Sequence, residues 1–209
     1  MRNCAFIVTG AFIAISAAQG ADVVELGYDN GSHYLHLAWY TGEGSWVAND
    51  FDLSTLKTKH DVVREIKFFT TRYWPNNQFD GFRIALFGMA GDVPGSMIWP
   101  AGGVGNFVKP TGGEGFKTFW VGHFLTSPKF AAAVEQYYDY PQCDPYFTDT
   151  NETFLNHSWQ KEEGTPWKKL EGLTNYPNRN LMLRVTVQLD YAEVAVSPAT
   201  LGRVKALYY

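Results

Sequence analysis

The stretch that decides the fold is residues 180–189, which read NLMLRVTVQL. Apolar side chains occupy every second position of this stretch from residue 181 onward. Successive side chains of a β-strand point to opposite faces of a sheet, so the alternation predicts a strand with one buried face. The apolar positions on that face are Leu181, Leu183, Val185, Val187 and Leu189.

Similar patterns recur in both directions from this strand. Further strands are predicted at residues 32–41, 46–53, 63–71, 81–89, 115–125 and 132–140. Segments rich in Gly, Pro and Asn separate them and indicate turns. This organisation predicts an all-β chain, an antiparallel β-sandwich of jelly-roll-like form with few short helices. The helix candidates are residues 54–64 and the C-terminal end of the chain.

The composition excludes several classes of protein. The chain has 209 residues, of which 45% are hydrophobic, 18% charged and 16% aromatic. Disordered chains are poor in aromatic residues, while collagens and coiled coils have periodic compositions that this sequence lacks. The formal net charge of −4 argues against a nucleic-acid partner, because such proteins present a basic surface.

The N-terminus predicts export. Arg2 precedes the apolar residues 5–15, and small residues fill positions 16–18, so residues 1–20 are interpreted as a signal peptide cleaved before Ala21. We therefore expect a secreted or cell-surface protein. No later segment reaches about 18 apolar residues, so no transmembrane helix is expected. Cleavage removes Cys4 and leaves Cys143, a single thiol that we expect to be packed rather than bonded or nucleophilic.

The mature chain divides at Val196-Ser197-Pro198. Residues 21–196 are predicted to form the β-sandwich domain, and residues 197–209 a basic and aromatic C-terminal tail. That tail fits either a sorting or docking segment or an edge element packed on the domain, because its apolar spacing suits a helix and a strand equally well.

Several short motifs stand in a recognisable order along the mature chain. They are residues 28–31 (YDNG), 46–51 (WVANDF), 82–87 (FRIALF), 91–95 (GDVPG), 140–144 (YPQCD), 157–159 (HSW), 181–184 (LMLR) and 201–209 (LGRVKALYY). In these motifs the chain resembles the β-sandwich domains of uncharacterised secreted bacterial proteins found in export and at the cell surface. The resemblance implies a jelly-roll-like sandwich and export, and it implies no defined catalytic residues.

Tryptophan is the most informative surplus, with seven residues in the chain. Trp74, Trp99 and Trp167 each adjoin a proline, which favours loop positions that are exposed or half-buried. Exposed aromatic rings stack on sugars or anchor protein partners. We therefore expect a non-enzymatic module that binds at or outside the cell surface, with a carbohydrate or a cell-surface protein as partner. A carbohydrate-binding module that uses these three tryptophans is the alternative.

Oxygen-bearing side chains are concentrated between positions 139 and 152. Calcium takes six to eight oxygen ligands from flexible loops, and an exported protein meets abundant calcium. The sequence therefore allows a structural calcium site, although no EF-hand spacing is present. The candidate ligands are Asp139, Asp144, Asp149, Asn151 and Glu152.

Enzyme motifs are absent, so we expect no catalytic residues. There is no Gly-x-Ser-x-Gly nucleophile motif and no phosphate-binding Gly-x-x-x-x-Gly-Lys motif. A jelly-roll glycoside hydrolase remains the least remote activity, since such enzymes need a pair of carboxyl groups. It would use Glu135 with a partner acid, and the acids near aromatic residues are Glu43, Asp50, Asp52 and Asp139.

Overall fold

The computed structural model describes residues 7–8, 11–12, 14–18, 21–38, 42–56, 58, 60–71, 81–149, 155–170 and 180–190. Its elements, in chain order, are β1 (Ile7–Val8), β2 (Ala11–Phe12), β3 (Ala14–Ala18), β4 (Ala21–Leu26), β5 (His33–Leu37), β6 (Ser45–Asp52), the 3₁₀ helix η1 (Ser54–Leu56), β7 (Val62–Thr70), β8 (Phe82–Ala90), β9 (Val93–Trp99), β10 (Asn106–Val108), β11 (Gly115–Phe124), β12 (Lys129–Gln136), β13 (Tyr146–Asp149), β14 (Ser158–Lys161), β15 (Lys168–Lys169) and β16 (Leu183–Leu189).

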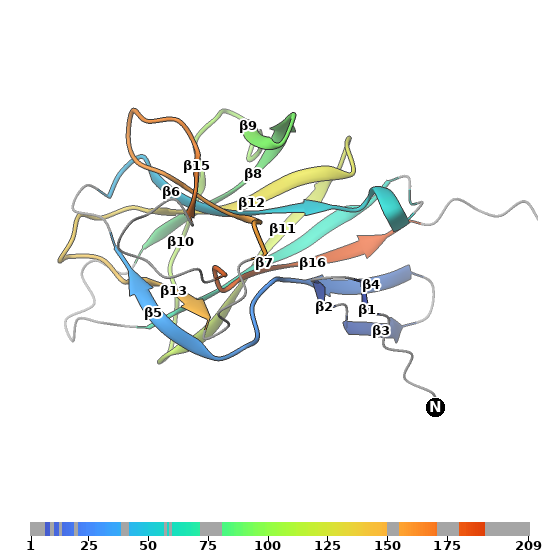
Figure 1. The fold of residues 1–209 in the computed structure, drawn as a ribbon, viewed down its shortest axis with the longest axis horizontal. Helices are drawn as coiled ribbons and strands as arrows, with labels where there is room; N and C mark the ends of the chain where they lie inside the picture. The colour runs from blue at the N-terminus through green and yellow to red at the C-terminus, as the bar shows by residue number, and fades with distance from the viewer. Residues whose placement is uncertain are drawn as a thin grey trace, which may run out of the picture.

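Two antiparallel sheets form the fold. One, which we call the β12 sheet, has the order β10-β8-β12-β6-β14-β15, with β9 paired to β8. The other, the β7 sheet, has the order β3-β4-β16-β7-β13-β5, with β11 paired to β7. Figure 1 shows the two sheets as layers, with β6, β8 and β12 above β7 and β16. The predicted all-β, antiparallel sandwich is confirmed.

The main core lies between the sheets. The alternating residues of β16 point inward, as the sequence pattern predicts, and Leu183, Val185 and Val187 are fully buried. They pack in one cluster with residues of the opposite sheet, among them Ile84 and Phe130. Burying apolar surface stabilises a fold by about 25 cal/mol per Å² removed from water. The described cysteine, Cys143, is a free thiol and forms no disulfide, so this burial is the main stabilising contribution.

A second apolar cluster covers the outer face of the β12 sheet. Ala48, Ala133 and Ala85 lie side by side in register on three neighbouring strands. Their methyl groups leave room for large rings, and the cluster is completed by residues that include Trp46 and Trp159. This explains why β12 is buried on both faces. Apolar side chains therefore pack on both faces of the β12 sheet.

The structure can be compared with two expectations from the sequence, the helix at residues 54–64 and the signal peptide at residues 1–20. The helix expected at residues 54–64 is wrong, because only η1 is helical within the described part of that segment and β7 begins at Val62. The β-branched pair Val62 and Val63 favours a strand, and pairing with β11 and β16 fixes it. Within the predicted signal peptide, β3 pairs with β4 at the edge of the β7 sheet. Cleavage before Ala21 would leave β4 paired with β16.

No helix in the part of the chain that the structure describes has the length and apolar character needed to cross a membrane.

Candidate functional site

A line of aromatic side chains runs along β11 on the outer face of the β7 sheet. The register places Phe116 opposite Phe69, Trp120 opposite Glu65, and Phe124 opposite Val62. The side chains of Trp120 and Phe124 are strongly exposed, at 59% and 66%. Residues four apart on a strand are separated by roughly 13 Å. We call Phe116, Trp120 and Phe124 the aromatic row.

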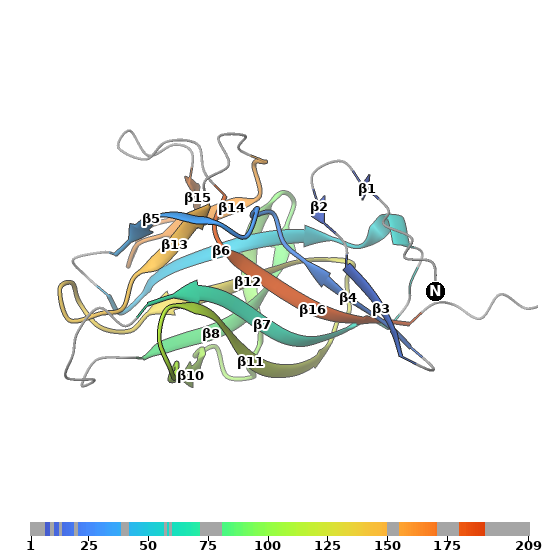
Figure 2. The ribbon, with the colours of Figure 1, turned by 90° about the horizontal axis from the view of Figure 1, so that it is seen from below.

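The row stands at the edge of its sheet. Among the described strands, β11 pairs with β7 alone. Figure 2 shows β16, β7 and β11 side by side, with β11 outermost of the three. An edge strand leaves one side of its backbone unpaired, so a ligand can reach both the rings and the backbone of β11.

Two neighbours hold the indole of Trp120 in place. The guanidinium carbon of Arg64 lies 4.5 Å from the centre of the ring, which is a cation–π contact. Arg64 is itself tied to β16, because it donates a hydrogen bond to Gln188. The second neighbour is Gly122, which lies in a bulge between Trp120 and His123 and has a φ of +67°. A Cβ at Gly122 would lie 2.9 Å from Nε1 of Trp120, so glycine leaves room for the ring.

Replacing Gly122 with alanine is therefore expected to destabilise the fold by about 1–2 kcal/mol and to displace Trp120, because the left-handed backbone and the ring both reject a methyl group. Urea unfolding measures the loss of stability, and subtracting the emission spectrum of Trp120→Ala isolates the signal of Trp120 from that of the other six tryptophans. Gly113→Ala is the control, since a Cβ at Gly113 would have no atom within 4 Å and this residue lies on the segment just before β11. Equal stability of the two variants would contradict this description of the bulge.

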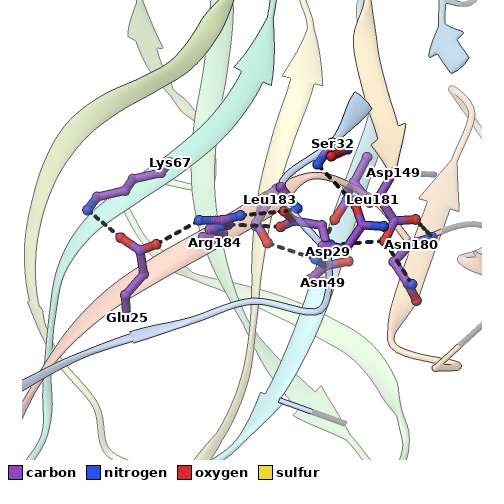
Figure 3. Close-up of polar contacts among 12 residues, drawn as sticks. Glu25, Asp29, Ser32, Asn49, Lys67, Asp149, Asn180, Leu181, Leu183 and Arg184 are labelled. Atoms are coloured by element: carbon purple, nitrogen blue, oxygen red, sulfur yellow. Dashed lines mark hydrogen bonds and ion pairs between the residues drawn. The ribbon is translucent and has the colours of Figure 1, made fainter. Parts of the chain in front are cut away.

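A ladder of ion pairs joins β4, β16 and β7, and Figure 3 shows the contacts of Glu25 with Lys67 and of Arg184 with Glu25 and Asp29. Glu25 of β4 accepts hydrogen bonds from Lys67 at 2.7 Å and from Arg184 at 3.0 Å. Arg184 also donates two hydrogen bonds to Asp29, from Nε at 2.9 Å and from a terminal nitrogen at 2.5 Å. Glu65 accepts from Thr186 at 3.0 Å and lies 3.5 Å from Lys67. We call Glu25, Asp29, Glu65, Lys67 and Arg184 the ion ladder.

The ladder shifts the titration of its members. Burial alone would raise the pKa of Glu25, but the hydrogen bonds from Lys67 and Arg184 outweigh burial and lower it. The hydrogen bonds to Asp29 raise the pKa of Arg184 above its ordinary value, despite partial burial. Glu25 and Arg184 are therefore charged and paired with each other at neutral pH.

The ion ladder and the aromatic row are continuous. Glu25, Thr186, Glu65 and Trp120 follow one another across four neighbouring strands in direct register. The guanidinium carbon of Arg184 lies 4.2 Å from the ring centre of Phe116. The outer face of the β7 sheet therefore combines exposed rings with hydrogen-bonding groups in a fixed arrangement.

Buried amides anchor this face to the rest of the sandwich. The side-chain nitrogen of Asn49, on β6 of the other sheet, donates to the carbonyl oxygens of Leu181 at 3.1 Å and Leu183 at 2.8 Å. The hydroxyl of Ser158 donates to the Oδ1 of Asn49 at 2.9 Å. The alternation places Asn49 on the same face as Val47 and Phe51, which is the buried face, but it does not show which groups the amide bonds.

The predicted calcium ligands occupy different settings. Asp149 is fully buried on β13, where it accepts hydrogen bonds from the backbone and side-chain nitrogens of Asn180. Burial raises the pKa of Asp149 against the lowering effect of those bonds. Asp144 is also buried, whereas Asp139 is exposed and accepts from the backbone nitrogen of Gly42 at 2.7 Å.

The other two predicted ligands, Asn151 and Glu152, lie outside the described residues. Within the described ranges, no group of three or more His, Cys, Asp or Glu side chains is placed to hold a metal ion. Calcium binding stays a prediction from the sequence.

The tryptophans singled out by their prolines lie elsewhere from the aromatic row. Trp99, on β9, is half-buried and packs against the main core. Trp167 is half-buried and meets the ring of Phe87 edge-on, with the ring centres 5.4 Å apart. Trp74 lies outside the described residues. Among the tryptophans that the structure describes, the strongly exposed one is Trp120, which has no neighbouring proline and which sequence reasoning did not single out.

The carboxyl group proposed for glycoside hydrolysis is held by an arginine. Glu135 is buried and accepts a hydrogen bond from the backbone nitrogen of Gly44 at 2.6 Å. One terminal nitrogen of Arg83 lies 3.4 Å from Glu135 and 3.2 Å from the exposed Glu43. Of the candidate partner acids, Glu43 thus lies near Glu135, but the guanidinium of Arg83 contacts both carboxylates, where a glycosidase would place the scissile bond.

Glu135 gives this pair a testable pH dependence. Burial raises its pKa above the ordinary value of 4.5, although Gly44 and Arg83 act in the opposite direction. A carboxyl with a raised pKa stabilises the folded state at low pH, and this contribution is lost as the pH rises through the folded-state value. Glu135→Gln is therefore expected to become more stable relative to the wild type as the pH rises from about 3 to 8. Thermal unfolding of both proteins across this range, with Glu43→Gln as the exposed control, measures the trend, and a constant difference would contradict it.

A small pocket of about 160 Å³ lies beside β6 and is lined by Asp50, Phe51, Asp52, Met89, Asp92, Lys129 and His157. His157 lies 2.9 Å from Asp50 and stacks on Tyr28 with the ring centres 4.1 Å apart.

Cys143 is buried, and its burial, together with the charges of Asp144 and Asp139, raises its pKa to about 12. Its thiol is therefore protonated at neutral pH, and His157 contacts Asp50 and Tyr28 rather than Cys143.

Comparison with known proteins adds no assignment to this geometry. No family model matches the chain, and a search of the curated proteins finds no match.

Proposed function

We propose that the chain is an exported, non-enzymatic binding module whose ligand contacts the aromatic row and the ion ladder. The observation that carries the proposal is the exposure of Trp120 and Phe124 on an edge strand. Large exposed apolar side chains that are held in place and surrounded by polar groups are typical of binding surfaces. Arg64 and Gly122 hold the ring of Trp120 before any ligand arrives, which reduces the entropy lost on binding.

The geometry of the acids argues against glycoside hydrolysis. Arg83 contacts both Glu43 and Glu135, so a cation lies against the pair of carboxyl groups. A glycosidase needs one carboxyl group that can donate its proton to the leaving oxygen and a second that faces the sugar. Export is supported by the N-terminal sequence, in which Arg2 and the apolar residues 5–15 precede the small residues of the predicted cleavage site.

The proposal is tested on an array of immobilised polysaccharides and extracellular matrix proteins, with calcium and with EDTA. We expect the wild type to bind at least one of these surfaces and Trp120→Ala to bind it at least about tenfold more weakly, because truncating a central aromatic contact removes about 2 kcal/mol or more. Chromogenic glycosides should not be hydrolysed. Equal binding by both proteins, or no binding to any surface, would refute the proposed site.

A further inference from the structure

We propose that the ligand is an extended neutral polysaccharide that lies along β11 across the aromatic row. This inference rests on the proposed function and adds the chemical class of the ligand. It follows from two properties of the outer face of the β7 sheet, the linear arrangement of its rings and the balance of its charges.

The rings suit a long chain rather than a single sugar. Phe116, Trp120 and Phe124 follow one another on the same strand and the same face, at intervals of roughly 13 Å or slightly less at the bulge. Such an interval is longer than one sugar ring, so a sugar ligand that contacts more than one member must span several sugar units, as an extended polysaccharide does. Aromatic faces attract the C–H groups of sugar rings because the faces carry partial negative charge.

Polar groups beside the row suit sugar hydroxyls. Thr186 and Glu65 lie in the same transverse row as Trp120, and Gln188 lies opposite Val62, which itself lies opposite Phe124. A carboxylate oxygen can accept more than one hydrogen bond, and a hydroxyl or amide can both donate and accept. A hydroxyl-rich chain above the rings therefore finds both kinds of partner.

The charges of the face select against acidic polymers. The carboxylates of Glu25, Asp29 and Glu65 balance the cations of Lys67, Arg184 and Arg64, and the five members of the ion ladder are bonded to one another. Arg64 is stacked on Trp120 and bonded to Gln188. A sulfated or uronic-acid chain would have to break the pairs of Lys67 and Arg184, or compete with Trp120 and Gln188 for Arg64, to find a counter-ion, whereas a neutral chain leaves these contacts intact. Binding of a neutral chain should therefore depend little on salt.

The experiment is affinity electrophoresis of the full chain in native gels that contain one polymer each. The neutral polymers are hydroxyethylcellulose, arabinoxylan, glucomannan, laminarin and dextran, and the acidic polymers are polygalacturonate, alginate and heparin. Each gel is run at low and at high salt with the wild type, Trp120→Ala, Phe124→Ala and Phe107→Ala. Phe107 is the matched control, because it is 49% exposed but lies on β10 of the other sheet.

We expect at least one neutral polymer to retard the wild type, with an affinity that changes less than about twofold with salt. Trp120→Ala and Phe124→Ala should each weaken it by about tenfold, and Phe107→Ala should not. Retardation by acidic polymers only, a strong salt dependence, or no retardation by any polymer would overturn the inference. If Trp120-dependent binding then appears only on proteins or acidic surfaces of the array, the proposed function stands without this ligand class. If no Trp120-dependent binding appears anywhere, both fail.

Discussion

Replacing Arg184 with alanine is expected to lower the free energy of unfolding by about 3–5 kcal/mol. Arg184 is the only described side chain that bonds both Glu25 and Asp29, and the side chain of Asp29 is fully buried. Removing the guanidinium leaves a buried carboxylate without its counter-ion, which is one of the most destabilising single changes in a protein interior. Chemical denaturation with urea at pH 7 gives the value directly.

Lys129→Ala is the control for this effect. Lys129 and Asp52 also form an ion pair, at 3.4 Å, but both side chains are more than 40% exposed. Exposed pairs contribute about 0–1 kcal/mol, so this variant should unfold almost like the wild type. If Arg184→Ala is no more destabilised than Lys129→Ala, the ion ladder is a surface feature and does not hold β4 against β16.

Replacing Asn49 with alanine is expected to destabilise the protein by about 2–4 kcal/mol. The amide of Asn49 satisfies two carbonyl oxygens of the opposite sheet and accepts a hydrogen bond from Ser158. Alanine leaves these groups buried without a partner, and each such group carries a desolvation penalty of about 1–3 kcal/mol unless water enters.

Asn106→Ala provides the comparison, because Asn106 is an exposed asparagine at the start of β10. It should change stability by no more than about 0.5 kcal/mol. Thermal unfolding of both variants separates the buried amide from the exposed one. Similar melting temperatures for the two would show that Asn49 does not join the sheets.

The strands were predictable where one face alone is apolar. In residues 180–189 the alternation is complete, and β16 buries the expected residues. The helix expected at residues 54–64 is wrong because the strand preference of the β-branched Val62 and Val63 outweighs the local helical spacing. Pairing with β16 fixes residues 62–64 as part of a strand, and β16 lies far away in the sequence.

The proposed binding surface could not be predicted from the sequence, for a physical reason. Both parities of β11 carry aromatic residues, with Phe116 and Trp120 on one and Phe119 on the other, so the sequence does not show which face is buried. Proline neighbours directed attention to Trp99 and Trp167, yet both of these rings pack against apolar clusters.

The acids near Arg83 were likewise only partly predictable from the sequence. Glu135 and Glu43 could both be identified from the sequence as acids near aromatic residues. The arginine between them could not, because Arg83 reaches the pair only through strand pairing between β8 and β12.

The most direct test of the proposed binding surface is hydrogen–deuterium exchange of the full chain with and without each neutral polymer used in the native gels. The unpaired edge of β11 should exchange readily in the free protein, since its outer amides have no neighbouring strand among the described residues. We predict that a bound polymer slows exchange in peptides that cover residues 115–124 and leaves residues 93–108 unchanged. Protection confined to residues 93–108 or 137–142, around the exposed Phe107 and Tyr140, would contradict the proposed binding surface.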